Sequence, residues 1–162
     1  MVYVVMGVCG CGKSTIGKIL AERIGNPFFD GDDFHTAENI EKMSRGHSLT
    51  DEDRKPWLQT IAKNIPIWNK KGGAVLACSA LKGIYRDWLL ENNDGGVNFI
   101  YLNGTRELLM KRLSQRKGHF MNPTLLDSQL KTQEIPEDAI NVSIDMDPNS
   151  IAQSILDEIK VC

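Results

Sequence analysis

The segment Gly7–Ser14 reads Gly-Val-Cys-Gly-Cys-Gly-Lys-Ser and matches the pattern G-x-x-x-x-G-K-[S/T] at every fixed position. A short hydrophobic run, Val2–Met6, precedes it, and an amphipathic stretch, Ser14–Ile24, follows it. Glycines in such a loop let the backbone N–H groups turn inward around phosphate oxygens, and the helix that follows adds the positive end of its dipole. The pattern therefore predicts a strand, a phosphate-binding loop and a helix in direct succession.

Each polar residue of the loop has a predicted role in binding ATP and Mg²⁺. We expect the Lys13 ammonium to reach the β and γ phosphates and to act in catalysis, and the Ser14 hydroxyl to bind Mg²⁺. The predicted contacts to ATP come from the whole loop, and they involve Gly7, Val8, Cys9, Gly10, Cys11, Gly12, Lys13, Ser14 and Thr15.

Length and charge limit the other classes of function. The chain has 162 residues, enough for a single domain with a continuous core, and we expect one domain over 1–162. A net charge of -2 gives no reason to expect a nucleic acid or an anionic membrane as a partner. The apolar runs are far shorter than the ~20 residues of a membrane span. No charged segment followed by a long apolar stretch opens the sequence, so we expect a cytoplasmic protein.

The four cysteines are Cys9, Cys11, Cys78 and Cys162, and free thiols are expected. A C-x-C pair without a second pair or a histidine cluster is a poor zinc site. Two interpretations of Cys9 and Cys11 stay open. A helix N-terminus lowers a thiol pKa, so the empty loop would be sensitive to oxidants and MgATP would protect it. Alternatively, the two are small buried side chains.

Strand-like runs alternate with amphipathic stretches along the chain. This alternation predicts right-handed crossovers, and hence a three-layer α/β fold with a parallel sheet of about five strands and helices on both faces. After a strand that leads through Phe28 and Phe29 into an acidic loop, the expected elements are helices at Asp51–Lys70, Gly83–Glu91, Arg106–Arg116 and Ser150–Lys160, and strands at Ala74–Cys78, Asn98–Leu102 and Val142–Asp145. The stretch 117–137 is interpreted as a polar segment.

Several segments beyond the loop resemble the gluconokinase family of small P-loop kinases. They are Phe29–His35, Asn39–Met43, Leu49–Trp57, Cys78–Lys82 with Tyr85–Asp87, and Arg112–Phe120. Together with the phosphate loop they cover nearly the whole chain. The resemblance implies ATP and Mg²⁺ as cofactors, and transfer of the γ-phosphate to a hydroxyl of a sugar acid, D-gluconate giving 6-phosphogluconate. Related bacterial enzymes are dimers, so a homodimer and a monomer both stay open.

The acidic loop Asp30-Gly-Asp-Asp offers a base for the acceptor hydroxyl at the end of the second strand. Asp30, Asp32 and Asp33 are all candidates, and the family pattern points to Asp32. The same residue is a candidate for holding Mg²⁺ through a water molecule. Asp30 and Asp33 fit the role of helix caps equally well.

Cationic and polar residues near the other strand ends are candidates for binding the acceptor. Lys82 and Arg86, four residues apart at the start of one helix, would present two cations to one point after the third strand. The resemblance adds His35 for substrate hydroxyls and Arg54 for a carboxylate, while Ser79 is a further hydroxyl donor. The alternatives are an exposed basic face for Lys82 and Arg86, and a surface ion pair of Arg54 with Asp51 or Glu52.

In related folds the region from about 114 to 137 is a mobile lid over the phosphates. The resemblance implies that Arg112 and Arg116 bind ATP there, with Arg116 stabilising the transition state, and that His119 contacts the substrate. Asp147 and Pro148 are weaker candidates for lining the adenine.

Three other interpretations compete with a sugar-acid kinase. Shikimate kinases place a glycine run after the third strand, where this chain has Cys78–Lys82 instead. An adenylate kinase would need a pocket for a second adenine, of which the sequence gives no sign. A nucleotide-binding module without catalysis is opposed by the intact Lys13, Ser14, Asp32 and Arg116.

Overall fold

The computed structural model describes residues 1–91, 93, 95–115 and 123–161. Five parallel strands form one sheet in the order β2-β3-β1-β4-β5. The strands are β1 (Val2–Met6), β2 (Phe28–Asp30), β3 (Ala74–Ala77), β4 (Val97–Asn103) and β5 (Ile140–Ser143). In the centre of the sheet, Val4 of β1 is in register with Leu76 of β3 and Phe99 of β4.

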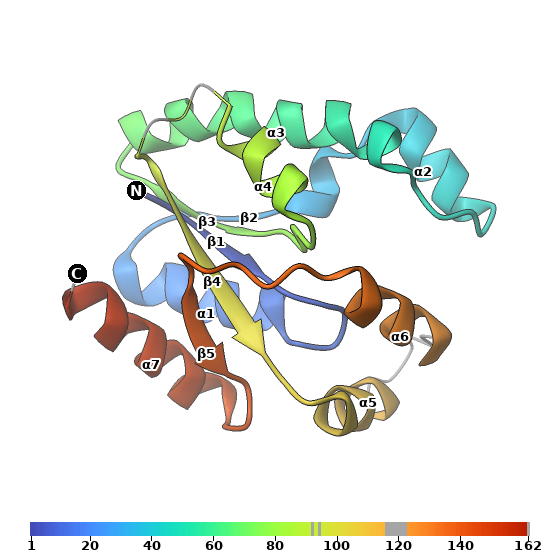
Figure 1. Ribbon diagram of the computed structural model, residues 1–162. Helices are drawn as coiled ribbons and strands as arrows, with labels where there is room; N and C mark the ends of the chain where they lie inside the picture. The colour runs from blue at the N-terminus through green and yellow to red at the C-terminus, as the bar shows by residue number, and fades with distance from the viewer. Residues whose placement is uncertain (92, 94, 116–122, 162) are drawn as a thin grey trace.

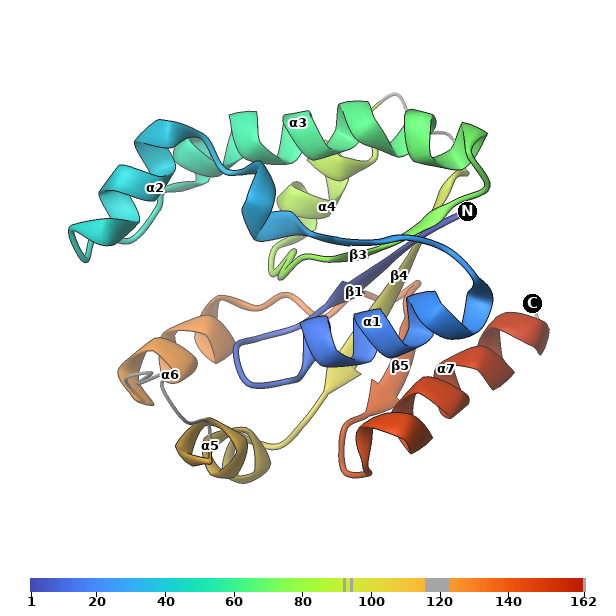
Figure 2. The same ribbon diagram turned by 180° about the vertical axis from the view of Figure 1, so that it is seen from behind.

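Helices cover both faces of this sheet, as Figures 1 and 2 show. The helical elements are α1 (Lys13–Ile24), the 3-10 turn η1 (Gly31–Phe34), α2 (Ala37–Ser44), α3 (Asp51–Lys70), α4 (Gly83–Leu89), α5 (Arg106–Ser114), α6 (Pro123–Thr132) and α7 (Pro148–Val161). Helices α1 and α7 pack on one face with Leu20 and Ile155 in the core, and α3 and α4 pack on the other with Ile61 and Leu89. The three-layer α/β prediction is confirmed.

Local signals explain where several helices begin and end. Thr50 caps α3 in a capping box, since its hydroxyl accepts from Asp53 N while the Asp53 carboxylate accepts from Thr50 N. Gly25 ends α1 in the left-handed conformation with φ 74°. Helix α3 spans Asp51–Lys70, which are the residues predicted from the sequence.

The stretch 117–137, interpreted as a polar segment with no assigned element, contains the helix α6 over Pro123–Thr132. Leu126 of this helix is fully buried, and Leu130, one turn further on, packs against the same core. This four-residue spacing is a helical signal that the polar residues around it obscured.

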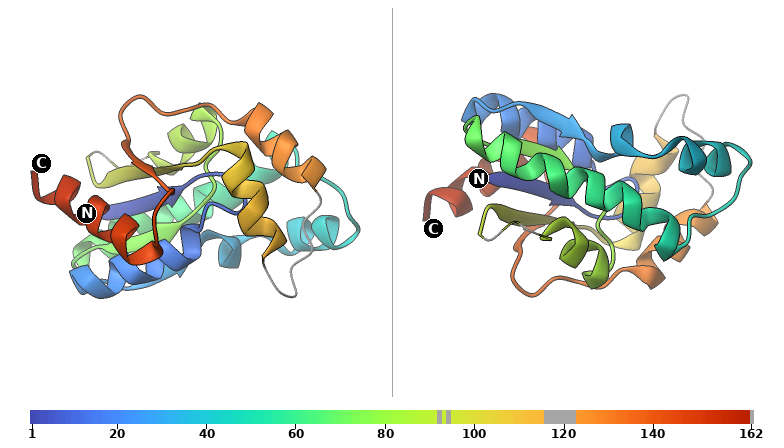
Figure 3. Two further views of the ribbon diagram at one scale, coloured as in Figure 1. Left: turned by 90° about the horizontal axis from the view of Figure 1, so that it is seen from below. Right: turned by 90° about the horizontal axis from the view of Figure 1, so that it is seen from above.

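Helices α2, α5 and α6 gather at the end of the molecule opposite the two termini, as both views of Figure 3 show. The β1–α1 connection and the acidic turn η1 lie at the carboxyl ends of β1 and β2, where open α/β sheets bind ligands. No helix in the described part of the chain is both long and apolar enough to cross a membrane.

Candidate active site

The phosphate loop bends tightly between β1 and α1. A side chain at Gly7, whose φ is +149°, would lie 2.8 Å from Cys11 Sγ and 3.1 Å from Leu102 O, so this position requires glycine. Lys13 folds back over the loop, and its Nζ donates to Val8 O at 3.2 Å. The lysine ammonium therefore lies over the loop where the sequence predicts phosphate binding.

The predicted Mg²⁺ ligand Ser14 lies beside Asp30, which the sequence interpretation considered as a base or as a helix cap but not as a metal ligand. Ser14 Oγ donates to Asp30 Oδ2 at 3.5 Å, and Asp30 Oδ1 accepts from Asp32 N at 3.0 Å. Asp30 therefore caps η1 and also faces the predicted Mg²⁺ ligand. Hydroxyl and carboxylate oxygens are the donors that Mg²⁺ prefers, so these side chains fit the ion. The described residues contain no cluster of three or more His, Cys, Asp or Glu side chains that could hold a metal ion.

Asp32 projects from η1 into the same cavity as the loop. A side chain at the preceding Gly31 would lie 2.8 Å from Ala77 O, so only glycine lets this turn approach the end of β3 so closely. The Asp32 side chain keeps 85% of its surface accessible. Partial desolvation by the cavity walls, and then the Asp30 carboxylate, raise the pKa of Asp32. A ligand can therefore reach this carboxyl group, which holds a proton more tightly than an ordinary aspartate does.

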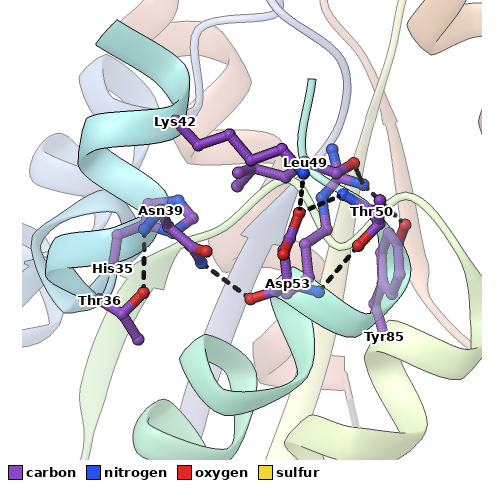
Figure 4. Close-up of polar contacts among 9 residues, drawn as sticks. His35, Thr36, Asn39, Lys42, Leu49, Thr50, Asp53 and Tyr85 are labelled. Carbon is purple, nitrogen blue, oxygen red and sulfur yellow. Dashed lines mark hydrogen bonds and ion pairs between the residues drawn. The ribbon is translucent and has the colours of Figure 1, made fainter. Parts of the chain in front are cut away.

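His35 lies beside Asp32 and is enclosed by its neighbours. Its ring stacks on Trp57 with centroids 4.0 Å apart, and its side chain is only 7% accessible. The Asn39 amide, drawn with His35 in Figure 4, approaches His35 Nδ1 at 3.5 Å and also donates to Asp53 O at 2.8 Å. Because the amide nitrogen donates, Nδ1 accepts and the ring proton resides on Nε2, which lies 3.8 Å from Asp32 Oδ1. Burial lowers the pKa of His35, which favours the neutral ring.

Two cavities meet at the carboxyl ends of β1 and β3. The phosphate cavity, of about 270 Å³, is lined by loop residues together with Asp30, Asp32 and Ser79. The acceptor cavity, of about 320 Å³, is lined by Arg54, Lys82 and Ser79 among others.

The cations of the acceptor cavity are already engaged. Lys82 Nζ lies 3.0 and 3.1 Å from the two carboxylate oxygens of Asp51, which also accepts from the Tyr85 hydroxyl. Arg54 donates to Leu49 O at 2.8 Å and to Tyr85 Oη at 3.0 Å. Hydrogen bonds from Tyr85 and Lys82 hold the pKa of Asp51 below its usual value. Asp51 and Tyr85 thus belong to the site, although the sequence interpretation gave Asp51 only as a surface partner of Arg54 and gave Tyr85 no role.

Arg86 does not converge with Lys82 on one point, contrary to the sequence-based expectation. Its guanidinium donates to Ala80 O at 2.8 Å and to Glu134 O at 3.0 Å, and it does not line the acceptor cavity. Ala80 has a positive φ of 43°, which is uncommon for a residue with a side chain. Arg86 therefore braces the strained turn that carries Ser79 and Lys82. The four-residue spacing of Lys82 and Arg86 correctly indicated the start of a helix. It could not indicate that the Arg86 side chain would bind the carbonyls of Ala80 and Glu134.

Of the three predicted lid residues Arg112, Arg116 and His119, the structure describes Arg112. Arg112 donates to Ile144 O and, at 3.2 Å, to Met146 O. Its Nη1 would lie 3.8 Å from a side chain placed at Gly12 of the loop, as would Ile16 Cγ1. Arg116 and His119 lie outside the described residues. Asp147 caps α7 by accepting from Ser150 N at 3.0 Å.

The loop thiols are enclosed. Cys9 is 8% accessible and Cys11 is fully buried, and Cys9, Cys11 and Cys78 do not form disulfides among the described residues. Reactive thiols need exposure, so this burial favours the interpretation as small packed side chains over an oxidant-sensitive pair.

The parallel sheet, the complete phosphate loop and the acidic turn beside it define a small P-loop kinase. A family model described as shikimate kinase matches residues 9–160. A probable gluconokinase of Xenopus tropicalis is 44% identical over 98% of this chain and 93% of its own, and the thermoresistant gluconokinase of Escherichia coli strain K12 is 40% identical over the same shares. The chain belongs to the gluconokinase family, within the wider group that the shikimate kinase model describes.

The comparison with solved structures agrees with the assignment to the gluconokinase family. The chain is similar to a gluconokinase from Sinorhizobium meliloti 1021, with a TM-score of 0.86 and 42% identity over 96% of this chain and 89% of that one. A shikimate kinase from Aquifex aeolicus vf5 has a TM-score of 0.63 at 17% identity, over 99% of this chain and 96% of that one, and this level of identity shows the common fold alone.

Proposed function

We propose that the protein transfers the γ-phosphoryl group of MgATP to the 6-hydroxyl of D-gluconate, giving 6-phosphogluconate and ADP. The observation that carries this proposal is the junction of two cavities, one lined by the phosphate loop and Asp32, the other by Arg54 and Lys82. Gluconokinases at 40 to 44% identity over nearly the whole chain support the choice of acceptor.

Asp32 is the proposed base. It shares the phosphate cavity with Lys13 and Ser14, and its raised pKa makes it a better proton acceptor than an ordinary aspartate. The acceptor oxygen forms a bond to the γ phosphorus while the bond from that phosphorus to the β–γ bridging oxygen breaks. The hydroxyl proton passes to the Asp32 carboxylate, and ADP leaves.

Lys13 and the loop amides hold the phosphates, and Ser14 with Asp30 and Asp32 would hold Mg²⁺ directly or through water. The bound ion would neutralise phosphate charge. Arg54 and Lys82 bind the acceptor carboxylate. The neutral His35 ring donates a hydrogen bond from Nε2 to a substrate hydroxyl beside Asp32. Ser79, on the boundary between the cavities, is a further hydroxyl donor.

Shikimate is the second candidate acceptor, because the matching family model carries that name. Shikimate is also a hydroxylated carboxylate, so the charges of the acceptor cavity alone do not distinguish it from gluconate. Purified protein with MgATP should be tested with gluconate, glucose, shikimate and AMP while ADP release is followed. Release that rises only with gluconate supports the proposal, release with shikimate supports the alternative, and no acceptor-dependent release would indicate a silent nucleotide-binding module.

We further propose one cytoplasmic domain over 1–162, with the segment from about 114 to 137 acting as a lid whose Arg112, Arg116 and His119 approach the phosphates and substrate. Size-exclusion chromatography with light scattering would distinguish the homodimer of related enzymes from a monomer.

A further inference from the structure

Gln129 on α6 contacts the phosphate loop in a way that no sequence pattern indicated. The backbone N–H of Cys9 donates to Gln129 Oε1 at 2.7 Å, across 120 residues of sequence. A backbone N–H can only donate, so the carboxamide oxygen must face the loop. The Gln129 NH₂ group is therefore turned away from Cys9, and the orientation of the carboxamide follows from the chemistry of its partner.

Gln129 also lies at the boundary between the phosphate cavity and the acceptor cavity. Gln129 and Ser79 are the two described residues that line both the phosphate cavity and the acceptor cavity. Gln129 Nε2 has no hydrogen-bond partner among the residues that the structure describes, and the side chain is half-buried. An oriented donor thus lies at the boundary that a phosphoryl group crosses when it moves from nucleotide to acceptor.

This boundary is where a donor is most useful chemically. During transfer, negative charge is spread over the three equatorial oxygens of the phosphoryl group, and fixed N–H donors there stabilise the transition state.

We propose that Gln129 is a catalytic residue, whose NH₂ group donates a hydrogen bond to the phosphoryl group during transfer while the Cys9 amide holds its oxygen. The inference rests on the proposed phosphoryl transfer and assigns to it a residue outside the phosphate loop and the acidic turn. Gln129 forms no covalent bond and moves no proton.

Two substitutions of similar size separate this role from a structural one. The carboxylate introduced by Gln129→Glu can still accept from Cys9 N–H but offers no donor, and Gln129→Met has neither group. We expect both variants to lose about 10²-fold in kcat, with KM for ATP and the sugar acid changed far less. Wild-type kcat in Gln129→Glu would indicate a purely structural latch, and wild-type kcat in Gln129→Met would indicate that only the added charge matters. Either result overturns the proposal.

Gln133→Met is the matched control, because Gln133 lies one turn further along and donates to the Tyr101 hydroxyl at 2.9 Å outside both cavities. Its kcat should stay at the wild-type level.

A binding measurement makes the test independent of turnover with gluconate. MgADP with aluminium fluoride imitates the planar phosphoryl group, whereas MgADP alone does not. Gln129→Met should weaken binding of the aluminium fluoride complex by about 10²-fold and leave the affinity for MgADP unchanged, as measured by calorimetry. Equal affinity of wild type and variant for that complex would overturn the role of Gln129 even if gluconate is the acceptor. Conversely, a wild type that binds the complex but does not phosphorylate gluconate would refute the proposed acceptor alone.

Discussion

Lys82 and Asp51 form a close ion pair, with the Lys82 nitrogen 3.0 Å from one carboxylate oxygen and 3.1 Å from the other. They come from different elements, since Asp51 begins α3 and Lys82 precedes α4. An anionic acceptor must therefore compete with a carboxylate of the protein for the cation. This competition weakens the binding of any carboxylate, and it also keeps Lys82 oriented before the acceptor arrives.

Removing either partner should change acceptor binding in opposite directions. We expect Lys82→Met to raise KM for the sugar acid about 10- to 100-fold, because a hydrogen bond to a charged group contributes about 1.5–3 kcal/mol. Asp51→Asn should lower that KM several-fold, because the competing charge is gone. Steady-state kinetics at saturating ATP would measure both. Lys63→Met, on the exposed surface of α3, is the control for loss of a positive charge, and an equal rise in KM there would refute a local role of Lys82.

Asp32 should control the acidic side of the pH profile. Its pKa is raised above the usual 3.8, so the carboxylate takes up a proton, and kcat/KM falls, at a higher pH than for an ordinary aspartate. Asp32→Asn should lower kcat about 10²- to 10⁴-fold and leave the affinity for ATP nearly intact. Asp33→Asn, one residue further along the same turn, is the matched control and should keep the rate, while its acidic limb moves slightly to lower pH because the Asp33 carboxylate also raises the pKa of Asp32. An unchanged kcat in Asp32→Asn would remove Asp32 as the base.

Local patterns predicted the parts of this molecule that depend on near neighbours in sequence. The phosphate loop follows from its glycines, and Asp51–Lys70 follows from its cap and its apolar spacing. The long-range pairings were not predictable in this way. Whether Asp51 meets Arg54 or Lys82, and whether Arg86 meets a ligand or Ala80 O, depends on how α3 and α4 pack. The Cys9–Gln129 contact likewise requires α6, whose helical spacing was hidden among polar residues.

Trp57 should matter for both stability and catalysis, because it supports the acidic turn from α3. Its buried indole N–H donates to Gly31 O at 2.7 Å, and its ring stacks on His35. Trp57→Phe keeps an aromatic ring but leaves that carbonyl without its partner. We expect a loss of about 1–3 kcal/mol in the free energy of unfolding, measured by urea denaturation, and a lower kcat because Asp32 is less well positioned. Trp88→Phe, which reduces a half-buried ring without an indole hydrogen bond among the described residues, should cost less stability and leave kcat near the wild-type value.

The ion pair of Lys42 and Asp53 should make the stability of the protein depend on pH. Lys42 Nζ lies 2.6 Å from Asp53 Oδ2, which also accepts from Thr50 N at 2.9 Å, as Figure 4 shows. The hydrogen bond from Lys42, and then that from Thr50 N, lower the pKa of Asp53 to about 2 from 3.8. A carboxyl group whose pKa is lower in the folded state stabilises it at pH values above the unfolded pKa, and this contribution is lost as the pH falls through the folded pKa.

We therefore expect Asp53→Asn to be less stable than the wild type above about pH 4. The difference should shrink between pH 3.8 and about 2, the interval between the unfolded and folded pKa values of Asp53. Urea denaturation at intervals from pH 2 to pH 7 would measure it. Glu41→Gln is the matched control, because Glu41 meets Arg45 at 3.9 Å on the exposed side of α2, where an ion pair contributes little. A constant difference between the wild type and Asp53→Asn across this range would show that the capping box acts through its shape, and that the charge of Asp53 has no part in holding α2 against α3.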